Sequence, residues 1–180
     1  IQGFFDIPVD NLFATPIFAR HARKKIKSKK IVCVAPDVGG TERARALGKL
    51  LNVGLAIVDK RRPKPGQSQV MNVIGDVKGQ TCIIVDDIID SGGTIVNAAK
   101  ALKEKGAKEV FVYITHGVLS GDAVKKIKNS VIKNLVITDT IDNSEKIKNV
   151  KNIEVLPISG LIGEAIKRIS NSTSVSDLFK

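Results

Sequence analysis

Short apolar runs alternate along the chain with longer segments of helical periodicity. The apolar runs span residues 31–35, 55–58, 81–85, 110–115, 135–138 and 153–156. Runs of this length without strict polar alternation are typical of strands that are buried on both faces of a sheet. We therefore predict an α/β fold, doubly wound around a mostly parallel sheet, with helices on both faces.

Helical patterns fill most of the intervals between these runs. They span residues 41–51, 94–105, 121–128 and 159–169. An earlier helix is predicted to have Thr15 as its N-cap and Pro16 at its first helical position. Residues 59–68 are basic and rich in proline and glycine, which predicts a surface loop, whereas residues 70–75 predict a short additional strand.

The composition is that of one globular domain. The chain has 180 residues, 43% of them apolar and 26% charged, which is enough for a core without disulfides or a structural metal. No apolar run is long enough to span a membrane, and the first residues lack a signal-peptide pattern. Cys33 and Cys82 each stand alone in an apolar run. We therefore expect a cytoplasmic protein with buried, reduced thiols.

The chain carries a formal net charge of +11. Such an excess is compatible with solvated lysines, with an acidic small-molecule ligand or with nucleic acid. Tryptophan is absent, there is one tyrosine, and no basic run is interleaved with aromatic residues. Because single-stranded nucleic acids are bound on aromatic stacking platforms, we expect solvated charge or a small acidic ligand rather than nucleic acid, and no membrane partner.

The strongest candidate site follows the apolar run 81–85. The acid pair Asp86 and Asp87 precedes a loop that opens a helix and consists of Asp90, Ser91, Gly92, Gly93 and Thr94. Backbone N–H groups at a helix N-terminus, with glycines that permit close approach, suit a phosphate dianion. The acid pair suits ribose hydroxyls or a metal shared with the ligand. The alternative is an ordinary strand-to-helix turn capped by Ser91.

A second loop of similar design follows the run 31–35. It contains Asp37, Val38, Gly39 and Gly40 and again connects a predicted strand to a helix. An acid followed by two glycines at a helix start can hold a diphosphate through backbone amides while the carboxylate reaches Mg²⁺. Taken alone the pattern is weak, because a turn capped by Asp37 would look the same.

The basic loop contributes a third candidate, the cations Lys60 and Arg62. Phosphoryl transfer places negative charge on the transferred group in the transition state, and cations that close over it are a common solution. A lysine point charge and a planar arginine fork would complement such a group. The alternative is a solvated basic loop without a catalytic role.

These segments together resemble one known family. The strand and loop that end in Asp-Ser-Gly-Gly-Thr are similar to the phosphoribosyl diphosphate (PRPP) fingerprint of type I phosphoribosyltransferases and PRPP synthetases. The other matching stretches resemble the ribose-phosphate pyrophosphokinase family in the family's order, and they are residues 1–12, 35–45, 59–63, 115–121 and 174–179. The resemblance covers essentially the whole chain.

The resemblance implies a type I phosphoribosyltransferase domain over residues 18–169, as part of an enzyme that makes PRPP and AMP from ribose 5-phosphate and ATP with Mg²⁺. It implies that Lys60 and Arg62 are catalytic, and that Asp37 holds the metal while Val38, Gly39 and Gly40 hold the diphosphate. Asp86 and Asp87 would bind the ribose hydroxyls, and Asp90, Ser91, Gly92, Gly93 and Thr94 the 5-phosphate. Ser174 and Ser176 would belong to a regulatory site, and the assembly would be a homo-oligomer, a hexamer by the family pattern.

The family also has a nucleotide-binding half with a catalytic histidine in an Asp-Leu-His-Ala stretch, and neither His21 nor His116 matches it. We therefore expect a fragment with little activity alone, whose residues 1–17 and 170–180 pack on that half. Two other hypotheses remain, a phosphoribosyltransferase that consumes PRPP and a non-catalytic relative, either a regulatory subunit of the synthetase or an RNA-binding regulator. His116, Arg43 and Arg45 are lower-ranking candidates for ligand contact.

Overall fold

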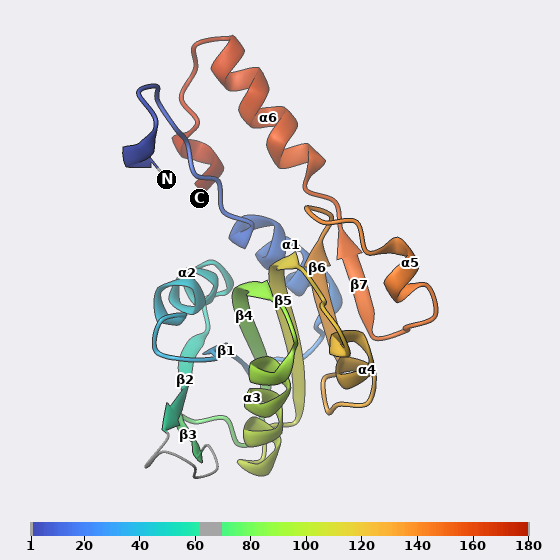
Figure 1. Ribbon diagram of the computed structural model, residues 1–180. Helices are drawn as coiled ribbons and strands as arrows, with labels where there is room; N and C mark the ends of the chain where they lie inside the picture. Colours follow the sequence, from blue (N-terminus) through green and yellow to red (C-terminus); the bar gives the residue numbers. More distant parts are fainter. Residues whose placement is uncertain (1, 62–69, 180) are drawn as a thin grey trace.

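The computed structural model describes residues 2–61 and 70–179 (Figure 1). Within these ranges one sheet has the strand order β3-β2-β1-β4-β5-β6-β7. The strands are β1 Ile31–Ala35, β2 Gly54–Arg61, β3 Val70–Ile74, β4 Thr81–Ile89, β5 Glu109–Gly117, β6 Asn134–Thr138 and β7 Ile153–Leu156. Neighbours are parallel except β2 and β3, which are antiparallel. The predicted fold class is confirmed, and each predicted run is a strand.

The helices also follow the predicted pattern. They are α1 Thr15–Lys25, α2 Thr41–Leu51, α3 Gly93–Glu104, α4 Ala123–Lys128, α5 Ser144–Ile147 and α6 Ser159–Ser170, with 3₁₀ turns η1 Gln2–Phe4 and η2 Ser176–Phe179. The predicted cap of the first helix is wrong. Ala14 is the N-cap, and buried Thr15 is already helical and makes no capping hydrogen bond.

The limits of two strands differ from the prediction because neighbouring strands extend the pairing. Asp59, Lys60 and Arg61 were expected in a loop but end β2, where their backbones pair with Asn72, Met71 and Val70 of β3. Asp86 and Asp87 were expected after a strand but lie inside β4, which continues alongside β5 to Ile89. These limits are set by hydrogen bonds to a neighbouring strand, and the sequence of one strand alone does not show where its neighbour pairs.

Successive residues of each strand enter opposite cores. Ile84 of β4 packs in one cluster with Ile95 and Leu102 of α3. Ile83, the residue before it, packs in the other cluster with Phe18 of α1 and with Leu47 of α2. The sheet therefore has α3 and α4 on one face and α1 and α2 on the other, as Figure 1 shows.

The order of the strands reverses beside β1. The chain passes from β1 to β2 and β3 on one side, and then returns to β4 on the other side of β1. The helices that follow β1 and β4, α2 and α3, diverge to opposite faces of the sheet. In open α/β sheets, ligands bind at the carboxyl ends of the strands at such a switch point.

The C-terminal part of the chain leaves the sheet. In Figure 1, α6 projects away from it, and η2 returns toward α1 near the N-terminal segment. Several apolar side chains on this side are exposed, namely Phe4, Ile7, Ile162, Ile166 and Ile169. None of the helices in the described residues is both long and apolar enough to cross a membrane.

Candidate active site at the switch point

The loop between β4 and α3 has the backbone geometry of an anion cradle. Gly92 is the N-cap of α3 with φ of +75°, a conformation that side-chain-bearing residues rarely adopt. The first-turn N–H groups that follow have no partner within the helix, so they are available to a ligand. Ser91 makes no capping hydrogen bond, so the alternative of a turn capped by Ser91 does not describe this loop.

A neighbouring segment supports this loop from behind. The backbone N–H of Ser120 donates to the Asp90 carbonyl at 3.1 Å, and Lys126 Nζ donates to the Ser91 carbonyl at 3.3 Å. A Cβ built on Gly92 would lie 3.7 Å from Ala123 Cβ. The start of α4 therefore holds the loop in place while Ser91 and Thr94 stay exposed.

The loop between β1 and α2 folds around Asp37. Asp37 Oδ1 accepts a hydrogen bond from the Gly40 N–H at 2.9 Å, and buried Gly40 is the N-cap of α2. A Cβ on Gly40 would lie only 3.2 Å from Pro36 Cδ, so glycine fits this turn. Asp37 thus does cap the turn, and because Asp37, Val38 and Gly39 are exposed, the same loop remains open to a ligand.

Arg43 connects the β1–α2 loop with the acid pair of β4. From the first turn of α2, its Nη1 donates to Asp86 Oδ1 at 2.6 Å and its Nη2 donates to Asp87 Oδ2 at 2.7 Å. Its guanidinium also lies against the β1–α2 loop, because a Cβ on Gly40 would be 3.7 Å from Nη1. The sequence made Arg43 only a lower-ranking candidate for ligand contact. Its position one turn after the Gly-Gly pair indicated a place near the loop, but its partners Asp86 and Asp87 lie on β4, which the local sequence does not reveal.

The environment of the acid pair changes the pKa of Asp86. Burial raises the pKa of Asp86 to about 6, although the hydrogen bond from the Asp87 N–H and the charge of Arg43 oppose the rise; the Asp87 charge adds to it. The Asp86 side chain is 19% exposed and that of Asp87 is 56% exposed. A buried carboxyl with a raised pKa beside a second acid is a frequent mark of a functional site.

The basic candidates are only partly within the described residues. Lys60 is the penultimate residue of β2, and its backbone pairs with Met71. Since β2 is parallel to β1, Lys60 reaches the same edge of the sheet as Asp37. Arg62 lies outside the described residues. The structure therefore places the backbone of Lys60 at the carboxyl edge of the sheet, on the strand next to β1.

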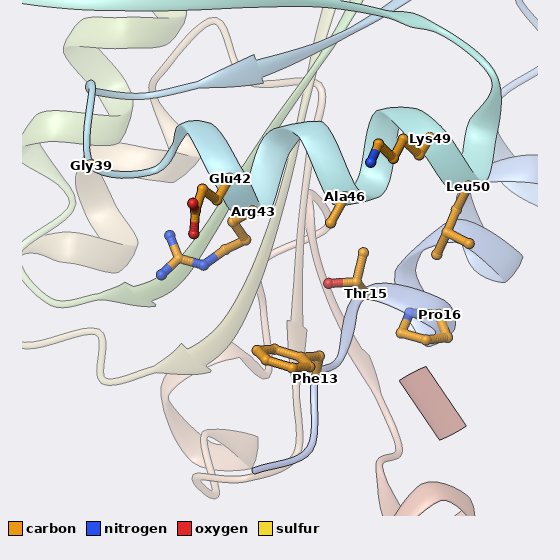
Figure 2. Close-up of a pocket in the computed structure, with 9 residues that line it drawn as sticks. All are labelled: Phe13, Thr15, Pro16, Gly39, Glu42, Arg43, Ala46, Lys49 and Leu50. Carbon is orange, nitrogen blue, oxygen red and sulfur yellow. The ribbon is translucent and has the colours of Figure 1, made fainter. Parts of the chain in front are cut away.

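A cavity of about 580 Å³ adjoins the loop between β1 and α2 (Figure 2). Gly39, Glu42 and Arg43 lie at one end, and Lys49 and Leu50 lie toward the other end of α2. Phe13, Thr15 and Pro16 form the wall opposite α2. The start of α1, with Phe13 before it, and helix α2 thus enclose a space that opens beside the candidate diphosphate loop.

The other candidates lie at different places. His116 Nδ1 is 2.9 Å from Thr140 Oγ1, and His116 lines a second cavity of about 340 Å³ together with Arg43 and Asp87. Arg45 is exposed on α2. Beyond α6, Ser176 N–H donates to Ser174 Oγ at 3.2 Å. His116 is thus near the acid pair, whereas Ser174 and Ser176 belong to the C-terminal turn.

The donor set suits magnesium held jointly with a ligand. Among residues 2–61 and 70–179, no three His, Cys, Asp or Glu side chains are grouped as a metal site. The exposed carboxylate of Asp37 lies in a loop built to approach phosphate oxygens. Mg²⁺ usually keeps several waters and takes one or two carboxylates plus substrate phosphates, so this loop fits the ion.

Comparisons with known proteins show the family of the chain. The profile of the phosphoribosyl synthetase-associated domain family matches residues 58–180. Over 179 residues the chain is 59% identical to the ribose-phosphate pyrophosphokinase of Bradyrhizobium diazoefficiens, covering 99% of this chain and 56% of that protein. The chain belongs to the phosphoribosyl synthetase-associated domain family, which confirms the resemblance. It spans a little over half the length of the curated relatives that it matches.

Solved structures extend the comparison to the fold. A phosphoribosylpyrophosphate synthetase from Mycobacterium smegmatis superposes with a TM-score of 0.85 at 36% identity, covering 95% of this chain and 55% of that one. An adenine phosphoribosyltransferase from Saccharomyces cerevisiae gives 0.53 at 21% identity, covering 66% and 74%. The second similarity concerns the fold alone.

Proposed function

We propose that this chain forms the ribose 5-phosphate- and diphosphate-binding part of a ribose-phosphate diphosphokinase. The observation that carries the proposal is the meeting of two glycine-containing loops and an acid pair at the switch point, linked by Arg43. The 59% identity to a ribose-phosphate pyrophosphokinase supports the same assignment. The intact acid pair and Lys60 favour a catalytic protein over a regulatory relative.

In the proposed reaction, O1 of ribose 5-phosphate attacks the β-phosphorus of ATP in line. The bond from that phosphorus to the oxygen bridging the α-phosphate breaks, AMP leaves, and the O1 proton is released. Residues Asp90, Ser91, Gly92, Gly93 and Thr94 hold the 5-phosphate, and Asp86 and Asp87 accept hydrogen bonds from the ribose hydroxyls. Holding both reactants in place is the main contribution of such a site.

The remaining roles concern the diphosphate. The backbone of Val38, Gly39 and Gly40 holds it, Asp37 holds Mg²⁺, and Lys60 and Arg62 neutralise charge in the transition state. Arg62 also contacts the sugar phosphate. When bound, Mg²⁺ supplies charge neutralisation on the diphosphate oxygens.

We also propose that residues 18–169 form the phosphoribosyltransferase-like domain and that residues 1–17 and 170–180 pack on a nucleotide-binding half. The exposure of Phe4 (86%) and Ile7 (68%) supports this, because large apolar side chains in a contiguous segment usually meet a partner surface. By family kinship the assembly is a cytoplasmic homo-oligomer, a hexamer, with Ser174 and Ser176 at a regulatory phosphate or nucleotide site.

Calorimetry with the 180-residue chain tests the sugar-phosphate site. The chain is expected to bind ribose 5-phosphate and to bind ribose far more weakly. Thr94→Ala should weaken ribose 5-phosphate binding roughly tenfold or more, because a hydrogen bond to a charged group is lost. Ser170→Ala, an exposed hydroxyl at the end of α6, serves as the control. Equal affinity for ribose and ribose 5-phosphate would overturn the proposal.

A second assay concerns the reaction. The 180-residue chain is expected to form little or no PRPP from ATP. The reason is that we assign ATP binding to the nucleotide-binding half of the related enzymes, which this chain does not cover. Robust PRPP formation by this chain would refute that division. Incubation with PRPP and purine or pyrimidine bases tests the competing phosphoribosyltransferase hypothesis, for which nucleotide formation would be decisive.

A further inference from the structure

Arg43 is committed to two carboxylates at once. Its two terminal nitrogens reach Asp86 at 2.6 Å and Asp87 at 2.7 Å, each in good range for a charge-assisted hydrogen bond. These are the same carboxylates that the proposed function assigns to the ribose hydroxyls. Asp86 Oδ1 already accepts a second hydrogen bond, from the Asp87 N–H at 3.0 Å, so a sugar hydroxyl that donates to this oxygen or to Asp87 Oδ2 would compete with the guanidinium for it.

The second neighbour of the guanidinium is the diphosphate loop. Nη1 lies 3.7 Å from the position that a Cβ on Gly40 would occupy, and Arg43 and Gly39 line the same end of the cavity in Figure 2. The base of the side chain is fixed, because the next residues of α2, Ala44 and Leu47, are completely buried. Its outer part borders solvent, since 31% of the side chain is exposed.

The charges favour an exchange of partners. While the sugar site is empty, Arg43 neutralises two adjacent acids that would otherwise repel each other. When ribose hydroxyls donate to these acids, the guanidinium loses hydrogen-bond acceptors and needs another anion. A diphosphate on Gly39 and Gly40 is an anion within reach that matches the planar fork of arginine.

We propose that Arg43 couples the two subsites: ribose 5-phosphate displaces it from Asp86 and Asp87, and it then contacts the diphosphate beside Gly40. This inference rests on the proposed function and adds an order to it, in which sugar binding prepares the diphosphate site. The coupling is reciprocal, so diphosphate binding tightens sugar binding by the same factor.

Calorimetry with the 180-residue chain and magnesium pyrophosphate, with and without saturating ribose 5-phosphate, measures this coupling. In the wild type, ribose 5-phosphate should tighten pyrophosphate binding roughly fivefold or more. Arg43→Gln should reduce that factor to about one, and Arg43→Lys should retain part of it. Arg45→Gln is the matched control, an exposed arginine two residues away on the same helix, and should leave the factor unchanged.

Asp87→Asn separates this exchange from a static role of Arg43. Without one of its carboxylate partners, Arg43 should be available earlier, so that pyrophosphate binds more tightly than in the wild type even without sugar. Removal of the Asp87 charge by itself also favours an anion, so the gain is compared with that of the double variant Arg43→Gln, Asp87→Asn. A gain that depends on Arg43 is lost in the double variant, whereas a purely electrostatic gain persists and would overturn the exchange. The double variant also lacks one of the two charges that Arg43→Gln alone leaves unpaired, which favours its folding.

The outcomes distinguish this inference from the function on which it rests. If ribose 5-phosphate and pyrophosphate both bind but independently, or if Arg43→Gln keeps the coupling, the exchange is wrong and the proposed function stands. If the wild type does not bind ribose 5-phosphate, the proposed function fails and the exchange fails with it.

Discussion

His21 Nε2 lies 3.0 Å from Glu154 Oε1, which joins helix α1 to the edge strand β7 across 133 positions of sequence. The other ring nitrogen of His21 lies 3.0 Å from the hydroxyl of buried Tyr113. Glu154 also accepts hydrogen bonds from Lys25 and Asn134, each at 2.9 Å. This polar network anchors on the sheet α1, the helix whose first residues, Thr15 and Pro16, form part of the cavity wall in Figure 2.

The network predicts a loss of stability in acid that depends on Glu154. Burial by itself would raise the pKa of Glu154, but hydrogen bonds from Lys25, Asn134 and His21 hold that pKa below its usual range. A lowered folded-state pKa stabilises the protein above the unfolded value of about 4.3, and this stabilisation is lost as the pH falls through the folded value.

Urea unfolding between about pH 3 and pH 6 measures this dependence. The free energy of unfolding of Glu154→Gln should vary less with pH than that of the wild type. Glu145→Gln, at an exposed acid on α5, is the control and should follow the wild type. Parallel curves for Glu154→Gln and the wild type would contradict the prediction.

Asp86 should have the opposite effect on stability. Its pKa is raised to about 6, mainly by burial, so the folded state holds the proton more tightly than the unfolded state does. Stability therefore falls as the pH rises from about 4 through 6. Asp86→Asn should be more stable than the wild type at pH 7.5, by on the order of 1 kcal/mol, while sugar binding weakens.

Thermal or urea unfolding of Asp86→Asn at several pH values checks this. Asp87→Asn is a matched control, because its side chain is 56% exposed and its neutralisation should change stability little. A destabilised Asp86→Asn with the pH slope of the wild type would show that this carboxylate does not carry an unfavourable charge.

Gly117 ends β5 where no larger side chain fits. A Cβ there would lie 2.8 Å from Ile137 Cδ1 and 3.2 Å from Ile137 Cγ2, and Ile137 is completely buried. Gly117→Ala should lower the free energy of unfolding by about 1–3 kcal/mol, and Ile137→Val should recover part of that loss in the double variant.

Gly163→Ala is the matched control, because Gly163 lies in α6 and a Cβ there would meet nothing within 4 Å. This variant should instead stabilise the protein by up to about 1 kcal/mol. Equal effects at both glycines would contradict this packing argument.

Gly92 and Gly93 should respond differently although they are adjacent. Gly92 has φ of +75°, so Gly92→Ala should lower stability by about 1 kcal/mol and weaken ribose 5-phosphate binding. Gly93 is the first residue of α3, and a Cβ there meets nothing within 4 Å, so Gly93→Ala should fold normally. Chemical denaturation of both variants measures the difference, and an unchanged Gly92→Ala would exclude strain at this position.

Lys60 should act on the transition state. With the proposed nucleotide-binding half supplied, Lys60→Ala is expected to lower kcat far more than it raises KM for ribose 5-phosphate. Steady-state kinetics measures both, and Lys49→Ala, on α2 at the far end of the cavity from Arg43, is the control. A normal kcat with a large rise in KM would assign Lys60 to ground-state binding instead.

The sequence by itself was enough for most of the fold and for the positions of the two glycine-containing loops. Local periodicity carries the information that makes residues 41–51 a helix and 153–156 a strand. Glycine at position 92 and the acid before Gly39 and Gly40 are needed by the backbone of their own turns, so a short motif reveals them.

Only the tertiary structure decided which distant groups meet. Asp59 and Asp86 lie within strands because neighbouring strands offer hydrogen bonds there, and that pairing is absent from any local window. Arg43 finds Asp86 across 43 positions because β1 and β4 pair side by side and bring their carboxyl ends together. The pairing partner of a charge depends on where the folded chain places it, whereas the shape of a turn depends on its own few residues.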